Sequence, residues 1–101
     1  MKLYLDTSSN LKTIIKIDDE ILECDSSKLH SQVILPMISE LLEKAAKKLS
    51  DITEIEVFAG PGSFTGLRVG ATIANALGYA LDVPVNGKHP KKLEIFEPNY
   101  E

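Results

Sequence analysis

Two polar loops hold the residues of this chain that could bind a phosphate group. The first loop spans residues 6–10 and follows an apolar segment. The second is the glycine-rich run 60–66, which follows the apolar segment 55–59 and opens a helical pattern. Backbone amides at a helix N-terminus favour an anion, and ligands of open α/β sheets bind beyond the strand ends. The predicted phosphate loops consist of Asp6, Thr7, Ser8, Gly60, Gly62, Ser63 and Thr65.

A structural interpretation of the same loops stays open. The run 60–66 lacks the lysine of a P-loop, and its glycine spacing is not that of a dinucleotide fingerprint. Glycines also permit a tight turn and close packing, and Asp and Ser commonly hydrogen-bond their own backbone in turns. The phosphate interpretation implies weak binding of ATP or ADP with magnesium. The structural one requires no cofactor.

Other catalytic chemistry has little support in the sequence. His30 and Ser31 are neighbours at a predicted helix start, and they lack a third member for nucleophilic catalysis. The chain has two histidines, far apart, and a single cysteine, Cys24, so neither a zinc cluster nor an intrachain disulfide is expected. We therefore predict that this protein is not an enzyme and holds no metal.

The elements that would position the loops follow from hydrophobic periodicity. Alternating and apolar segments predict strands at 2–6, 11–17, 20–24, 55–59 and 83–86, and helices at 30–49 and 63–81. We expect an α/β fold with a five-stranded mixed sheet of order 3-2-1-4-5, similar to ribonuclease H. Right-handed crossovers place both helices on one face. Residues 91–96 are predicted to form an edge strand or a tail.

The second predicted helix is apolar around most of its circumference. Its polar residues fall in one narrow arc, and a ladder of small residues, Gly66, Gly70, Ala74 and Gly78, recurs every fourth position. Each interior glycine costs about 0.5–1 kcal/mol relative to alanine, so close approach of another backbone is expected. That backbone could belong to the same chain or to a second chain. The predicted partner interface consists of Met37, Leu41, Leu67, Gly70, Ala71, Ala74 and Gly78.

The whole string of residues 60–70, GPGSFTGLRVG, closely resembles the signature of the TsaB (YeaZ) family. Residues 3–8, 30–38 and 83–85 resemble the opening strand, the first helix entry and a later strand of that family. The resemblance implies the sugar kinase, Hsp70 and actin superfamily fold. It also implies a non-catalytic scaffold that docks a TsaD-like enzyme, with a TsaE-like ATPase, in threonylcarbamoyladenosine modification of tRNA. The two helices would form the surface for both TsaD pairing and self-pairing as a homodimer.

Length and composition favour one soluble, cytoplasmic domain. The chain has 101 residues, 44% of them hydrophobic, and a formal charge of −4. We expect a core over residues 1–87, with 88–101 as a tail or edge segment. Family members usually continue into a second domain, which we expect to be absent here. Scattered lysines argue against strong, autonomous nucleic-acid binding, and no apolar run is long enough to span a membrane. A stand-alone homodimeric interaction module is a further alternative.

Overall fold

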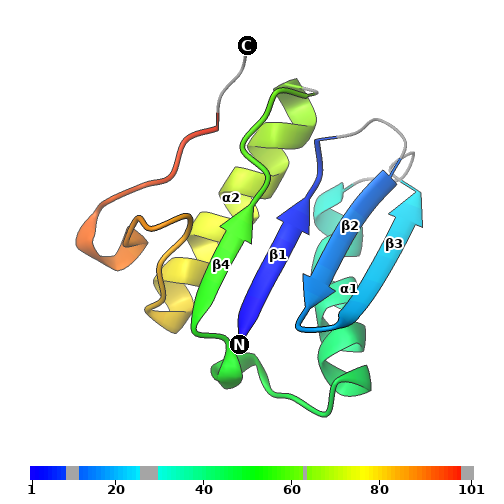
Figure 1. Cartoon of the computed structure of the whole chain (residues 1–101). Coiled ribbons are helices and arrows are strands. Elements are labelled where there is room, and N and C mark those ends of the chain that lie inside the picture. The colour runs from blue at the N-terminus through cyan, green and yellow to red at the C-terminus, as the bar shows by residue number, and fades with distance from the viewer. Residues whose placement is uncertain (9–11, 26–29, 63, 99–101) are drawn as a thin grey trace.

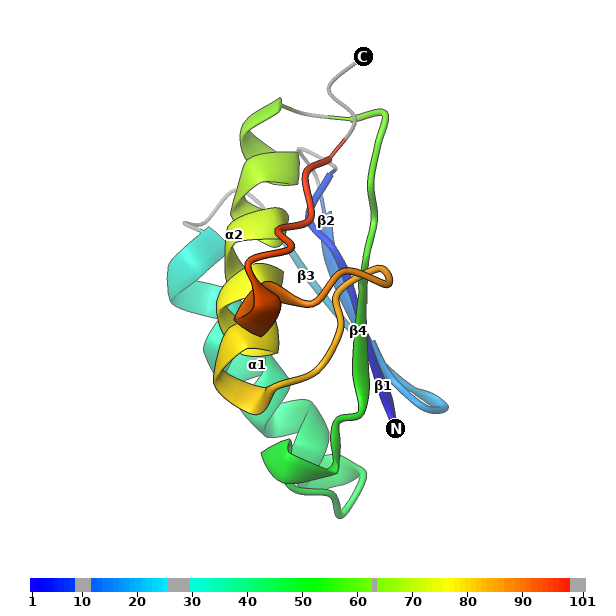
Figure 2. The same cartoon turned by 90° about the vertical axis from the view of Figure 1, so that its left-hand side faces the viewer.

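The computed structural model describes residues 1–8, 12–25, 30–62 and 64–98. Its elements, in chain order, are β1 (Lys2–Asp6), β2 (Lys12–Ile17), β3 (Glu20–Asp25), α1 (His30–Lys44), η1 (Leu49–Asp51), β4 (Glu54–Val57), α2 (Phe64–Leu81) and η2 (Pro90–Lys92). The described strands form one sheet of order β3-β2-β1-β4, in which β1 and β4 run parallel and the other neighbours antiparallel. Both helices pack on the same face of this sheet (Figures 1 and 2).

Alternation along the strands explains why only one face is covered. In the register of β1, Leu3 lies between Ile17 and Ile55, and Leu5 is next to Val57. All five side chains are buried beneath the helices. The alternate residues face the other way, where the Lys2 ammonium forms an ion pair of 2.8 Å with Glu56. Burying such charges would be costly, so this face stays in water.

The predicted fifth strand is not a strand. Val85 makes only an isolated parallel bridge with Ile55, and the sheet has four strands within the described residues. The chain turns away at once, because Asn86 and Gly87 adopt positive φ values of 47° and 82°. The Asn86 side chain then completes the edge of β4: its amide donates to the Val57 carbonyl and accepts from the Val57 N–H, both at 2.9 Å.

The first helix ends earlier than its pattern predicted. α1 stops at Lys44 and not at residue 49, although Pro36 is tolerated inside it. Ala46 adopts a left-handed conformation with φ of 56°, and the Lys47 N–H reaches back to the Leu42 carbonyl at 2.9 Å. These contacts form a Schellman cap with alanine in place of the usual glycine. Because that glycine is the sequence signal for such a cap, the end of α1 could not be predicted at Lys44. α2 ends at Leu81 as predicted, with Asp82 in the same left-handed role.

The segment after β4 and α2 is packed against the rest of the chain. Pro90 and Phe96 are both buried, and the Phe96 ring joins the hydrophobic core. Residues 91–96 therefore form neither an edge strand nor a loose tail; they run from η2 along α2 (Figure 2). Among the described residues, no helix has the length and apolar character needed to cross a bilayer.

Candidate functional site

The two predicted phosphate loops meet in the structure. β1 and β4 are parallel neighbours, so the loops that follow them leave the same end of the sheet. Gly62 lies directly against Ser8: a Cβ atom on Gly62 would be 2.7 Å from the Ser8 Cβ and 3.1 Å from the Ser8 carbonyl oxygen. The absence of a side chain at Gly62 therefore allows the loops to touch. Ser63 lies outside the described residues.

Asp6, Thr7 and Ser8, the described residues of the first loop, all make hydrogen bonds through their side chains. Both the N–H and the hydroxyl of Ser8 donate to Asp6 Oδ1, at 3.0 and 2.6 Å. The Thr7 side chain is buried, and its hydroxyl donates to the Gly66 carbonyl at 2.5 Å. This bond fixes the first turn of α2 to the end of β1. In this structure the two hydroxyls therefore act as turn and packing groups.

A bound nucleotide fits this arrangement poorly. The Asp6 carboxylate lies beside the donors that a phosphate would need, and it would repel the phosphate unless a cation lay between them. No group of three His, Cys, Asp or Glu side chains lies together in the ranges that the structure describes, so a magnesium ion there would take most of its ligands from the phosphates and from water. Gly60, Gly62 and Thr65 remain accessible to varying degrees. Arg68 lines a groove together with Thr65 and contacts the Phe64 ring, but the run 60–66 has no lysine of the kind that a P-loop supplies.

The seven residues predicted to form the partner interface are buried inside the chain. The set comprises Met37, Leu41, Leu67, Gly70, Ala71, Ala74 and Gly78. This choice of residues is corrected by the structure, since a side chain enclosed by its own fold offers no surface to a partner. The small residues of α2 instead let it lie close on the rest of the chain. A Cβ on Gly70 would collide with the Thr7 hydroxyl, and one on Gly78 would be 2.6 Å from the Val85 side chain.

Another part of the two-helix layer is exposed and apolar. Leu35 on α1 and Phe64 on α2 are 53% and 54% exposed, whereas Val69, Ile73 and Leu77 are half-buried. Two shallow grooves follow these side chains. The first, of about 320 Å³, is lined by Phe64, Thr65, Arg68, Val69, Thr72 and Ile73. The second, of about 360 Å³, is lined by Leu35, Ile38, Ser39, Leu42, Glu43, Lys47, Leu49 and Leu77.

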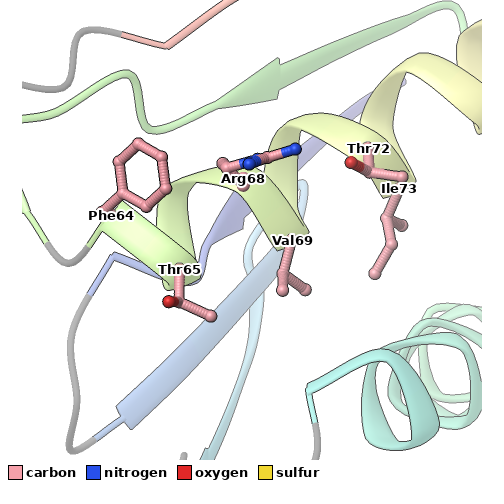
Figure 3. Close-up of a pocket in the computed structure, with 6 residues that line it drawn as sticks. All are labelled: Phe64, Thr65, Arg68, Val69, Thr72 and Ile73. Carbon is pink, nitrogen blue, oxygen red and sulfur yellow. The ribbon is translucent and has the colours of Figure 1, made fainter.

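Figure 3 shows how the first groove is built along α2. Val69 and Ile73 point to the side on which α1 lies, and Phe64 and Arg68 lie on the other side of the groove. The Arg68 guanidinium is 5.5 Å from the centre of the Phe64 ring, in a cation–π contact. The groove thus offers aliphatic contacts with one cation at its rim. This composition suits a protein partner better than a small polar substrate.

The apolar excess on α2 is the sequence signal for these exposed residues. The predicted interface includes the small residues Gly70, Ala74 and Gly78, for which contact within the same chain is the alternative prediction. Helical geometry places Val69, Ile73 and Leu77 on the flank next to the ladder. Because the arc of Gly66, Gly70, Ala74 and Gly78 is buried against the rest of the chain, the larger residues on the flank are the better candidates for contact with a partner.

Comparison with known proteins gives consistent matches. A family model described as TsaD, tRNA N6-adenosine threonylcarbamoyltransferase, matches residues 14–90. A protein of Haemophilus influenzae, the tRNA threonylcarbamoyladenosine biosynthesis protein TsaB, is 43% identical over 60 residues, covering 59% of this chain. The tRNA N6-adenosine threonylcarbamoyltransferase of Nitrosospira multiformis is 38% identical over 73 residues, covering 72% of this chain.

A solved structure agrees with the sequence matches. YeaZ from Pseudomonas aeruginosa superposes with a TM-score of 0.68 and 35% identity over 83% of this chain. The chain spans only part of each relative: 25% of the Haemophilus protein, 21% of the Nitrosospira protein and 40% of the YeaZ chain.

Proposed function

Because the chain belongs to the family described by TsaD, and within it matches the N-terminal part of TsaB (YeaZ), we propose that it is a non-catalytic, helix-pairing subunit. These relatives point to a role in tRNA threonylcarbamoyladenosine biosynthesis. The proposed role is to dock a TsaD-like enzyme through the exposed face of α1 and α2. A TsaE-like ATPase is the third expected component. The observation that carries the proposal is the pair of apolar grooves on that face.

The exposed side chains support docking through their position as well as their chemistry. Leu35 and Leu77 line the second groove, and Val69 and Ile73 line the first, so the apolar surface continues across both helices. Large apolar side chains left in water beside half-buried ones are typical of a surface that a partner covers. The proposal assigns no chemistry to the chain itself. The reaction would belong to the docked enzyme.

Binding to a TsaD-like protein from the same cell tests the proposal. The full chain and the TsaD-like protein are mixed, and the mass of the complex is measured by light scattering after gel filtration. We expect a complex with the unmodified chain. Leu35→Glu or Phe64→Glu should weaken it at least about tenfold, since a charge would be desolvated in an apolar contact. Circular dichroism checks that each variant is folded.

Ile21→Glu is the matched control. Ile21 on β3 is 56% exposed, a fraction similar to those of Leu35 and Phe64. Its side chain lies on the face of the sheet away from the helices. This variant should bind as the unmodified chain does. The proposal fails if no complex forms at micromolar concentration, or if all three variants bind equally well. A chain that is dimeric alone and ignores the TsaD-like protein would instead support the stand-alone homodimer.

A further inference from the structure

A short basic loop is fixed at the edge of the sheet beside β4. Val85 and Lys88 exchange two backbone hydrogen bonds, at 2.7 and 2.9 Å, around the tight turn at Asn86 and Gly87. Positive φ values at both central residues are those of a type I′ hairpin turn. The Asn86 side chain ties the turn to both backbone groups of Val57. These hydrogen bonds therefore fix the start of the loop to β4.

The second half of the loop is equally well anchored. Pro90 is fully buried against α2, where the missing side chain of Gly78 leaves room for it. The Glu94 carboxylate accepts a hydrogen bond of 3.1 Å from the His89 N–H, and the Glu94 N–H donates to the His89 carbonyl. These contacts set the course of η2 and hold its lysines at the surface.

The loop has a local charge opposite to that of the chain. Lys88, Lys91 and Lys92 are all exposed, and residues 83–93 contain no aspartate or glutamate, whereas the whole chain has a formal charge of −4. None of the three ammonium groups forms an ion pair with another residue in the described ranges. Lys2 and Lys44, in contrast, are paired with Glu56 and Glu40. Three lysines without an ion pair among the described residues thus lie within one five-residue segment, where the Glu94 carboxylate is bound to the His89 N–H.

We propose that this basic loop, residues 88–92, contacts phosphate groups of an RNA backbone. The inference rests on the proposed function, which makes a tRNA the shared substrate of the complex. The Cα atoms of Lys88 and Lys92 lie at most about 14 Å apart, because an extended residue spans no more than ~3.6 Å. That span allows the three lysines to meet neighbouring phosphates of one strand.

The position of the loop is compatible with docking through the helices. In Figure 1 the loop and η2, in orange, lie at the β4 edge, and α1 lies at the opposite side of the sheet. An RNA contact there would leave the α1 and α2 grooves free. The acidic remainder of the chain would keep the contact weak on its own. It would add to the binding of another subunit and not replace it.

Salt-dependent RNA binding tests the inference without any partner protein. Fluorescence anisotropy would follow binding of the full chain to a labelled, unmodified tRNA transcript over a series of salt concentrations. We expect weak binding at low salt. The triple variant Lys88→Gln, Lys91→Gln, Lys92→Gln should lose about tenfold in affinity or more. Its slope of log K against log salt should fall by about 2–3, since each phosphate contact contributes ~0.7–0.9.

The matched control removes the same number of charges elsewhere. Lys16→Gln, Lys44→Gln, Lys48→Gln removes exposed lysines on β2 and around the end of α1, outside both grooves, and should leave affinity and slope nearly unchanged. The inference is overturned if the unmodified chain does not bind at low salt, or if the two triple variants behave alike. It is also overturned if polyglutamate competes as well as RNA of equal charge, which would identify an acidic protein as the partner. Failure of TsaD docking leaves this result unaffected.

Discussion

Asn75 holds Phe96 by both of its backbone groups. The Asn75 side-chain amide donates to the Phe96 carbonyl at 2.9 Å, and the Phe96 N–H donates to the Asn75 side-chain oxygen at 3.2 Å. A side chain on α2 thus takes the place of a neighbouring strand for this segment. The Phe96 ring is thereby held in the core, where it is 8% exposed.

Asn75→Ala should loosen this segment. Two hydrogen bonds are lost, each contributing about 0.5–1.5 kcal/mol, so the free energy of unfolding should fall by about 1–3 kcal/mol. Urea unfolding gives that value, and hydrogen exchange at the Phe96 amide should become faster. Thr72→Ala, at an exposed position on the same helix, is the control and should change stability by no more than ~0.5 kcal/mol. Equal stability of the two variants would show that the Asn75 bonds do not hold the segment.

Gly78→Ala should destabilise the fold although alanine favours helices. The added Cβ would be 2.6 Å from the Val85 side chain and 3.0 Å from the Val83 carbonyl oxygen, which is backbone and yields little. Overpacking typically costs about 1–3 kcal/mol, against a helix-propensity gain of ~0.5–1 kcal/mol. We expect a net loss of about 1 kcal/mol in chemical unfolding.

The control for this glycine reverses the substitution on the exposed side of α2. Ala76→Gly should cost about 0.5–1 kcal/mol from propensity alone, because Ala76 is exposed. A Gly78→Ala variant more stable than the unmodified chain would contradict the account of close packing given for the glycine ladder.

The sequence predicted the layers of this fold well because its periodicities were strong. The alternation of Thr13, Ile15 and Ile17 identified a strand with one buried face, and the glycine-rich start and Asp82 bounded α2. The left-handed cap at Ala46 was missed, since alanine carries no signal for that conformation. The prediction of a fifth strand at 83–86 was wrong. The apolar pattern at 83–85 does not reveal that Asn86 and Gly87 turn the chain back.

The candidate site was predicted in part. The proximity of Ser8 and Gly62 followed from the parallel arrangement of β1 and β4. The sequence did not reveal that the Ser8 hydroxyl would donate a hydrogen bond to Asp6 and the Thr7 hydroxyl one to Gly66. Hydrogen-bond partners depend on the three-dimensional path of the loops. The role of Asn75 was also hidden, because a polar residue on a helix is ordinarily read as solvated.

Calorimetry with ATP or ADP and magnesium should show no binding at micromolar concentration. The Ser8 donors are occupied by Asp6, whose negative charge opposes a phosphate at the same place. Titration of the full chain gives the answer directly. Micromolar binding that disappears in Asp6→Ala would reverse our conclusion and make these loops a nucleotide site.

Tyr4 should make stability sensitive to alkaline pH. Partial burial raises the pKa of the Tyr4 phenol above its ordinary value of 10.0, and the nearby Asp6 and Glu56 carboxylates add to the effect. The folded state therefore prefers the neutral phenol. Its contribution to stability is fully present below pH 10 and is lost as the pH rises through the raised pKa.

Tyr4→Phe isolates this effect because phenylalanine does not titrate. The free energy of unfolding, measured in urea from pH 8 to about pH 11, should fall more steeply for the unmodified chain than for Tyr4→Phe above pH 10. Tyr79→Phe is the control, since Tyr79 is 56% exposed and lies on α2. Lysines titrate in the same range, but all three proteins share them, so the difference between the curves reports the tyrosine. If Tyr4→Phe and Tyr79→Phe give parallel curves, the open face of the sheet does not shield the Tyr4 phenol.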